Sequence, residues 1–116
     1  MIVYGLKNCD TCRKALKWLA EEGIPHRFHD VRKDGLVAEE LARWLAAIDR
    51  NLLINRRGTT YRQLGDAEKA VLEGEDPAAL LLTQPAVIKR PIFSKDGRYL
   101  VGFGEAEKAT LKEWAR

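Results

Sequence analysis

The sequence predicts an α/β protein in which a β-α-β unit and a β-β-α unit are separated by a helical segment. Near the N-terminus, a short apolar run gives way to residues with the period of a helix. The middle of the chain carries a long amphipathic pattern. Two apolar runs flank a turn near the C-terminus, and another amphipathic pattern follows them. Joining the two units gives one sheet with helices packed on it.

The N-terminal segment predicts a strand, a helix and a second strand. Ile2–Leu6 is an apolar run with the length of a buried strand. From Thr11 the apolar residues recur with helical spacing, and Gly23 followed by Pro25 supplies a stop signal. His26–Val31 then alternates well enough to predict a second strand. A β-α-β unit is therefore expected to open the chain.

The rest of the chain predicts a helical middle and a C-terminal hairpin. Apolar residues follow helical spacing from Val37 to Ile48, whereas Asn51–Leu64 is polar and shows little periodicity. Pro91 interrupts an apolar run and indicates an edge strand or an active-site strand. The further expected elements are helices at Asp66–Leu72 and Pro77–Thr83, a hairpin with strands over Val87–Phe93 and Tyr99–Val101 around a turn at Ser94–Gly97, and a final helix over Glu105–Arg116.

Length and composition predict one globular domain spanning residues 1–116, and we expect a monomer. The chain has 116 residues, of which 46% are hydrophobic and 32% are charged. No apolar run approaches the ~20 residues of a membrane helix, and no secretory signal opens the sequence, so the expected location is the cytoplasm. The net charge of +3 arises from 20 basic and 17 acidic residues scattered along the chain, which does not favour direct binding of nucleic acid.

The two cysteines, Cys9 and Cys12, stand three residues apart where the first helix is expected to begin. Unpaired backbone N–H groups and the helix dipole favour a thiolate at this position, so Cys9 is the predicted nucleophile. Lys7 and Arg13 would lower its pKa further, whereas Asp10 would oppose them. Cys12 lies about one turn further along and can attack a mixed disulfide formed on Cys9. The pattern therefore predicts thiol-disulfide chemistry.

Two other interpretations of the cysteines stay open. Both could be inert small residues in the core. Alternatively, they could bind zinc together with His26 and His29, whose spacing approaches that of a two-Cys, two-His site. In a zinc finger the helix carries the histidines, whereas the helix expected here begins at the cysteines and ends before either histidine. We therefore expect no metal site and assign neither histidine a catalytic role.

Three segments resemble motifs of the ArsC/Spx family, with the strongest likeness to its YffB subgroup. The segments are Tyr4–Ala15, Asn55–Arg62 and Ile88–Ile92. The resemblance spans nearly the whole chain and implies a thioredoxin-like fold with a helical insert, which also has the element order predicted above. It implies that Arg57 and Arg90 hold an oxyanion or the carboxylate of a thiol cosubstrate beside Cys9. It further implies a cis bond before Pro91 that faces this cysteine, with the Arg90 guanidinium directed at the thiol.

The resemblance implies an enzyme, namely a glutathione-dependent thiol reductase related to arsenate reductases. Glutathione would be a cosubstrate, no cofactor would be bound, and the expected substrate-binding residues are Lys7, Arg13, Arg57, Arg90 and Pro91. Arsenate reductases of this type use a third arginine shortly after the hairpin. This chain has no basic residue at Val101–Gly104, which argues against arsenate as the substrate.

The alternative is an Spx-like redox-sensing regulator that binds RNA polymerase, because Spx-type regulators also carry a cysteine at the position of Cys12. The sequence does not select the physiological substrate. Glutathionylated proteins, small disulfides and inorganic oxyanions all require the same thiolate and the same positive pocket.

Overall fold

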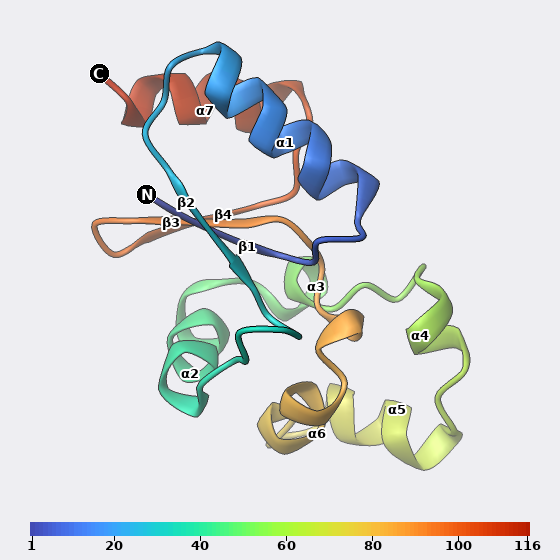
Figure 1. Ribbon diagram of the computed structural model, residues 1–116. Helices are drawn as coiled ribbons and strands as arrows, with labels where there is room; N and C mark the ends of the chain where they lie inside the picture. Colours follow the sequence, from blue (N-terminus) through green and yellow to red (C-terminus); the bar gives the residue numbers. More distant parts are fainter. The chain divides into compact units, whose positions relative to one another are not determined.

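The computed structural model describes all 116 residues, which form two compact units (Figure 1). The sheet unit comprises residues 1–35 and 90–116, and the helical unit comprises residues 36–89. The expectation of a single domain over residues 1–116 stays a prediction. In chain order the elements are β1 (Ile2–Gly5), α1 (Asp10–Glu21), β2 (Arg27–Asp30), α2 (Ala38–Ala47), α3 (Arg50–Leu53), α4 (Thr59–Arg62), α5 (Asp66–Glu73), α6 (Ala78–Thr83), the 3₁₀ helix η1 (Pro85–Val87), β3 (Ile92–Lys95), β4 (Arg98–Val101) and α7 (Glu105–Trp114).

The sheet unit has the predicted order of β-α-β followed by β-β-α. Its four strands lie in the order β2-β1-β3-β4, with β1 parallel to β2 and the other neighbours antiparallel. Of the two expectations for Pro91, an edge strand or an active-site strand, the edge strand is wrong, because β3 is an inner strand. Pro91 directly precedes Ile92, the first residue of β3, so its missing N–H interrupts no bond of the strand ladder.

Two helices, α1 and α7, cover the same face of this sheet (Figure 1). The strand β1 is apolar because it lies inside the sheet, and Val3 points into the core between the sheet and these helices. Gly23 ends α1 as predicted, since its φ of +67° is a conformation that favours glycine and its N–H donates to the carbonyl of Ala20. The buried residues of this core are Val3, Ala15, Leu19, Ile24, Phe93 and Leu111.

The helical unit confirms the predicted middle helix as α2 and contains two helices that the sequence does not reveal. Within the polar stretch Asn51–Leu64, the chain forms α4 and most of α3, each only four residues long and therefore too short to show a period. The predicted strand over Val87–Phe93 begins too early. Val87 ends η1, and Ile88 pairs only in an isolated bridge with Ile54. None of the helices is long and apolar enough to span a membrane.

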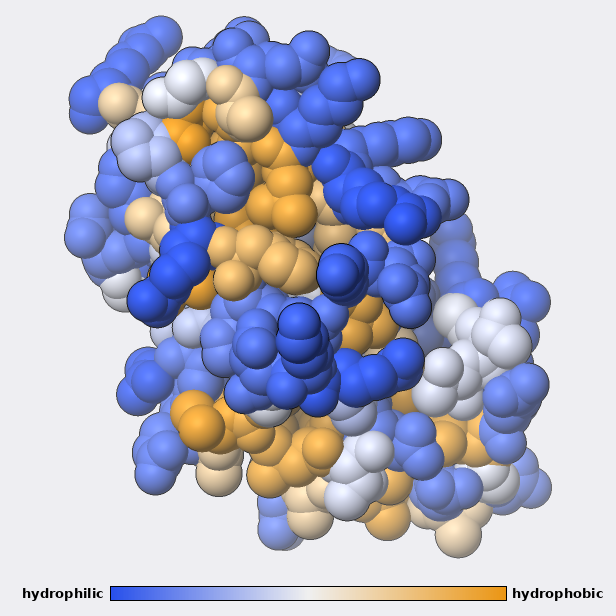
Figure 2. Space-filling model, in the orientation of Figure 1, coloured by the Kyte–Doolittle hydropathy of each residue, from blue (hydrophilic) through white to orange (hydrophobic).

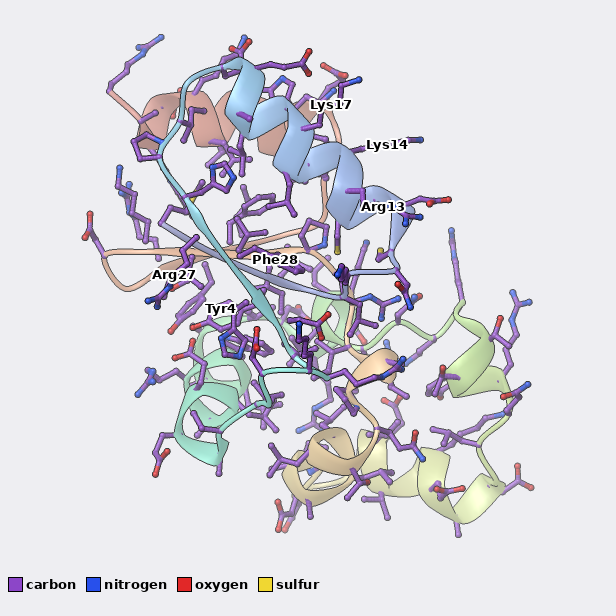
Figure 3. The ribbon with its side chains drawn as sticks, viewed as in Figure 1. Tyr4, Arg13, Lys14, Lys17, Arg27 and Phe28 are labelled. Atoms are coloured by element: carbon purple, nitrogen blue, oxygen red, sulfur yellow. The ribbon has the colours of Figure 1, made fainter.

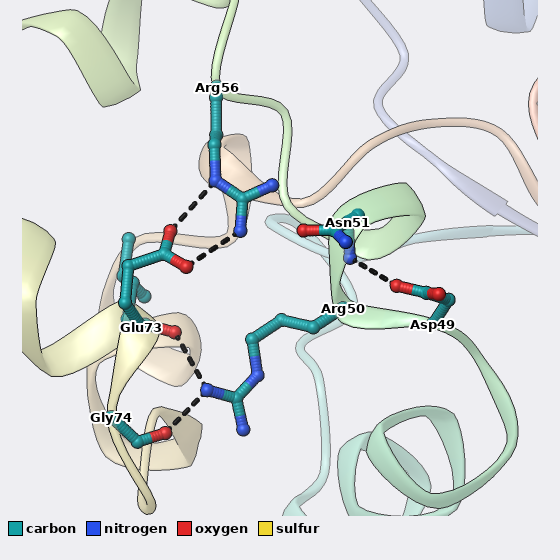
Figure 4. A network of polar contacts seen from close by, with 7 residues as sticks. Asp49, Arg50, Asn51, Arg56, Glu73 and Gly74 are labelled. Atoms are coloured by element: carbon teal, nitrogen blue, oxygen red, sulfur yellow. Dashed lines mark hydrogen bonds and ion pairs between the residues drawn. The ribbon is translucent and has the colours of Figure 1, made fainter.

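Two arginines bind the C-terminal end of α5 within the helical unit (Figure 4). Arg56 donates from Nε and Nη2 to the two carboxylate oxygens of Glu73, at 2.7 and 2.8 Å. Arg50 donates to the backbone carbonyls of Leu72, at 3.3 Å, and Gly74. In each case the planar guanidinium donates two hydrogen bonds and holds two segments of the chain together. Arg56 is thus occupied within the unit, whereas its neighbour Arg57 remains exposed.

The adjacent leucines of α3 provide a test of this packing. Leu53 is fully buried, whereas 52% of Leu52 is exposed. Leu53→Ala should lower the free energy of unfolding by about 2 to 5 kcal/mol, because it leaves a cavity in the helical unit. Leu52→Ala should change it by no more than about 0.5 kcal/mol. Urea unfolding monitored by circular dichroism measures both free energies of unfolding. Equal destabilisation by the two substitutions would show that α3 is not packed as described.

Candidate functional site

Cys9 is the residue immediately before α1. Its backbone N–H donates to the carbonyl of Leu6 at 3.1 Å, and its own carbonyl accepts from the N–H of Arg13 at 3.0 Å. The side chain is half-buried, and its thiol is free of any disulfide. A tight turn at the end of β1 thus places the sulfur at the exposed N-terminus of a helix, as the sequence predicts.

Three groups around the Cys9 sulfur favour its ionised form. Burial acts against ionisation, but the backbone N–H of Cys12, the Cys12 thiol and the Arg90 guanidinium together lower the pKa of Cys9 below its usual value. Arg90 acts both by hydrogen bonding and by its charge. The Arg90 side chain is therefore directed at the thiol, as predicted. A lowered pKa is what a nucleophilic thiol requires, and the role of Cys9 as the nucleophile stays a prediction.

Cys12 lies in the opposite environment, with 1% of its surface exposed. Burial and the neighbouring Cys9 together raise the pKa of Cys12 to about 12, against the opposing hydrogen bond from the backbone of Leu6. Cys12 is therefore a neutral thiol that donates toward Cys9. The interpretation of both cysteines as inert core residues fits the burial of Cys12 only.

Gly5, at the end of β1, makes room for the Cys12 sulfur. A Cβ at this position would lie 2.5 Å from Sγ of Cys12 and 3.3 Å from the ring of Phe28. The first of these distances is shorter than side chains tolerate, so only glycine allows α1 to approach the strand this closely. The sequence shows Gly5 only as one residue of the apolar run Ile2–Leu6 and does not reveal this role.

The bond between Arg90 and Pro91 is cis, which confirms the expectation from the resemblance. Pro91 is buried, and its carbonyl accepts from the N–H of Gly102 at 2.9 Å. Gly102 has a φ of +92°, a conformation that favours glycine, directly after β4. The end of β4 therefore holds the backbone that presents Arg90 to Cys9.

The other predicted basic residues are placed differently from Arg90. Arg13 is paired with Asp10 on the surface of α1, and the groups that lower the pKa of Cys9 are Cys12 and Arg90 instead. The Lys7 side chain is exposed. Arg57 lines a pocket of about 430 Å³ in the helical unit. Substrate binding by Lys7, Arg13 and Arg57 stays a prediction.

Asp30, at the end of β2, is a positioning residue that the sequence analysis missed. With 7% of its surface exposed, it accepts from the backbone N–H groups of Lys7, Arg32 and Lys33 at 2.8 to 2.9 Å. Burial acts against ionisation, but these donors hold the pKa of Asp30 below its usual value. Asp30 thereby ties the loop that leads into Cys9 to the turn after β2. An acidic residue at a strand end is too common for the sequence to reveal this function.

The two histidines hydrogen-bond to backbone carbonyls and not to the cysteines. Nδ1 of His26 donates to the carbonyl of Ile24 at 2.8 Å, and Nε2 of His29 donates to that of Gly35 at 2.6 Å. No group of three or more His, Cys, Asp or Glu side chains is arranged to hold a metal ion. The zinc interpretation of the cysteines therefore has no support in the structure.

A four-stranded sheet of this order, with a cysteine before α1 and a cis-proline before β3, defines a thioredoxin-like thiol protein. Residues 4–111 match the ArsC family, and the chain belongs to that family. This confirms the family and the fold that the sequence motifs imply.

The chain is similar to proteins of solved structure and to a transcriptional regulator. The solved structure of a protein named YFFB is 42% identical, with a TM-score of 0.83 over 95% of this chain and 96% of that one. An arsenate reductase (ArsC) related protein from Brucella melitensis is 43% identical, with a TM-score of 0.73 over 94% and 91% of the two chains. The global transcriptional regulator Spx of Staphylococcus epidermidis is 30% identical over 86% of this chain and 77% of the regulator.

The thiol environment predicts how the cysteines titrate. Iodoacetamide should modify Cys9 first, at a rate that rises with pH and levels off above the lowered pKa of this thiol. Arg90→Ala should shift the profile to higher pH, because it removes a hydrogen bond and a positive charge from the thiolate. Arg13→Ala is the matched control and should shift it less, since Arg13 pairs with Asp10. Faster labelling of Cys12, or equal shifts in the two variants, would contradict this assignment.

The contact between Gly5 and Cys12 can be tested with a double-mutant cycle. Gly5→Ala should destabilise the fold by about 1 to 3 kcal/mol, because the new Cβ overlaps the sulfur of Cys12. It should also raise the pKa of Cys9, since the displaced thiol no longer supports the thiolate. In a Cys12→Ala background the destabilisation by Gly5→Ala should be smaller. Urea titration gives the stabilities, and strict additivity of the two substitutions would rule the contact out.

Proposed function

We propose that this protein is a glutathione-dependent thiol reductase that uses Cys9 to reduce mixed disulfides. The observation that carries the proposal is the contrast between two neighbouring thiols. Cys9 is half-buried with a lowered pKa, whereas Cys12 is buried and neutral. A stabilised thiolate at an accessible helix terminus is the arrangement that thiol-disulfide exchange requires.

The first step is attack by the Cys9 thiolate on the glutathione sulfur of a mixed disulfide. The substrate S–S bond breaks, the substrate thiolate leaves and takes up a proton from solvent, and a disulfide forms between Cys9 and glutathione. The substrate sulfur is reduced, and Cys9 is oxidised. Arg90 supports the reactive thiolate before the attack and offers a positive charge to an anionic group of glutathione.

The second step regenerates Cys9. A second glutathione thiolate attacks the glutathione sulfur of the adduct, which yields oxidised glutathione and free Cys9. Cys12 offers another route, in which its sulfur attacks Cys9, releases glutathione and leaves an internal disulfide that two further glutathione molecules reduce. The high pKa of Cys12 makes it a poor nucleophile, so the proposed main route uses glutathione.

Membership of the ArsC family supports a thiol-based reductase, and the resemblance of the motifs to the YffB subgroup suggests glutathione as the cosubstrate. Arsenate is not the proposed substrate. The segment after β4 carries no arginine, and its Gly102 has a φ that favours glycine. The proposed reaction takes place in the cytoplasm, where thiols are kept reduced.

A second candidate function is redox-sensing regulation through RNA polymerase. The similarity to the regulator Spx favours it, and Spx-type regulators also carry a cysteine at the position of Cys12. A regulator would use Cys9 and Cys12 as a switch and would not turn over disulfides. The two candidates therefore differ in whether glutathione is consumed.

Turnover of the mixed disulfide between glutathione and 2-mercaptoethanol, with reduced glutathione present, tests the proposal. Cys9→Ser should lower the rate at least about a hundredfold, because it removes the nucleophile. Cys12→Ser should retain activity, because glutathione itself resolves the adduct. Consumption of NADPH through coupled glutathione reductase measures the rate.

Three outcomes would contradict this proposal in different ways. Equal activity of wild-type protein and Cys9→Ser would exclude Cys9 as the nucleophile. Loss of activity in Cys12→Ser would replace glutathione by Cys12 as the resolving thiol. No turnover by the wild-type protein, together with capture of RNA polymerase subunits by the immobilised chain, would favour the regulator.

A further inference from the structure

Two adjoining pockets lie beside the loop that leads into Cys9, within the sheet unit. They share the wall formed by Leu6, Lys7 and Asn8. The first pocket has a volume of about 430 Å³, and the second has about 230 Å³. Because Asn8 lines both pockets and directly precedes Cys9, this surface begins next to the nucleophile.

The first pocket is largely apolar. Besides the shared wall, it is lined by Cys12, Arg13, Leu16 and Phe28, and Cys12 contributes a neutral thiol. Leu16 and Phe28 pack against the core but stay partly exposed. Figure 2 shows apolar surface between α1 and β2 with hydrophilic side chains around it. A site of this composition gains free energy by covering an apolar side chain.

The second pocket presents positive charge. Lys7, Arg32 and Lys33 are exposed around it, and Asp30 is the acidic residue in its wall. The Asp30 carboxylate is buried and accepts from the backbone of these same three residues, so it holds the loops in place and leaves their side chains facing outward. The pocket therefore favours carboxylates.

We propose that the two pockets form one docking surface for an extended segment of a protein substrate. An apolar side chain of this segment occupies the first pocket, and adjacent acidic side chains contact the second. The inference rests on the proposed reductase function and names its substrate class, which is glutathionylated proteins whose modified cysteine lies near an acidic and apolar segment.

Two other ligands fit this surface less well. Glutathione carries carboxylates but no large apolar side chain, so it would leave the first pocket empty. A nucleic acid requires a longer row of cations, whereas α1, next to this surface, also carries the acidic residues Asp10 and Glu21. A protein segment supplies both chemistries at the spacing of neighbouring residues.

Binding can be measured apart from catalysis. The probe is a fluorescent hexapeptide in which two adjacent leucines have two glutamates on each side, and its fluorescence anisotropy is measured with the reduced wild-type chain and with Cys9→Ser. Both proteins should bind it. Replacing the glutamates by lysines, or the leucines by serines, should weaken binding at least about tenfold. Equal binding of the three peptides would overturn the proposal.

Variants of the chain locate the binding surface. Arg32→Glu combined with Lys33→Glu should weaken binding of the acidic peptide at least about tenfold, because it reverses two charges at the second pocket. Leu16→Gln should weaken it through the first pocket. Lys14→Glu is the matched control and should have a smaller effect, since Lys14 lines neither pocket and lies on the side of α1 that points away from Phe28 (Figure 3). Equal losses in the charge-reversal variant and the control would overturn the proposal.

Failure of this inference differs from failure of the proposed function. If the wild-type chain reduces the small mixed disulfide but does not bind the acidic peptide, only the docking surface is excluded. If the peptide binds but no disulfide is turned over, the docking surface stands and the reductase function is excluded. Stronger competition by a single-stranded oligonucleotide than by unlabelled peptide would overturn the docking surface in favour of nucleic acid.

Discussion

The close approach of α1 to β1 at Gly5 is the constraint on which the site depends. The Cys12 sulfur fills the space that a Cβ on this glycine would occupy. Because the contact lies in the first turn of α1, it fixes where the helix begins and which residue stands at its open end. Cys9 takes that position, and its side chain stays partly exposed. Packing inside the sheet unit thereby determines which thiol can react.

The electrostatic environment then gives two chemically identical side chains different pKa values. The groups that stabilise the Cys9 thiolate are the N–H and thiol of Cys12 and the guanidinium of Arg90, and the first two are available because Cys12 is buried and neutral. Ionisation of Cys9 in turn disfavours ionisation of Cys12. Arg90 arrives from a distant part of the sequence, through the cis peptide before β3. Two cysteines in one helical turn therefore differ in protonation, because Cys9 favours the thiolate whereas Cys12 stays a neutral donor.

The sequence predicts those features of the fold that have a period or a motif. The strand Ile2–Gly5, the helix α2 and the existence of the final hairpin are visible in the spacing of apolar residues, whereas the bounds of β3 are not, and Cys9 is visible in its motif. The four-residue helices α3 and α4 escape detection, because one turn has no period. The roles of Gly5 and Asp30 are not visible in the sequence for a different reason. Their roles arise from tertiary contacts to Cys12 and to Lys7, which local sequence does not encode.

Asp30 connects the loop before Cys9 with the basic pocket of the sheet unit. Its carboxylate binds the backbone of Lys7 before α1 and of Lys33 after β2, so one buried charge organises both the loop that carries Cys9 and the rim of the basic pocket. The hydrogen bonds of this carboxylate go to backbone donors, and its charge also attracts Arg32, which lies exposed at the pocket. The positive surface next to the nucleophile thus follows from how the loop is held. Under the proposed function, an anionic substrate segment would meet this charge beside the loop that leads into Cys9.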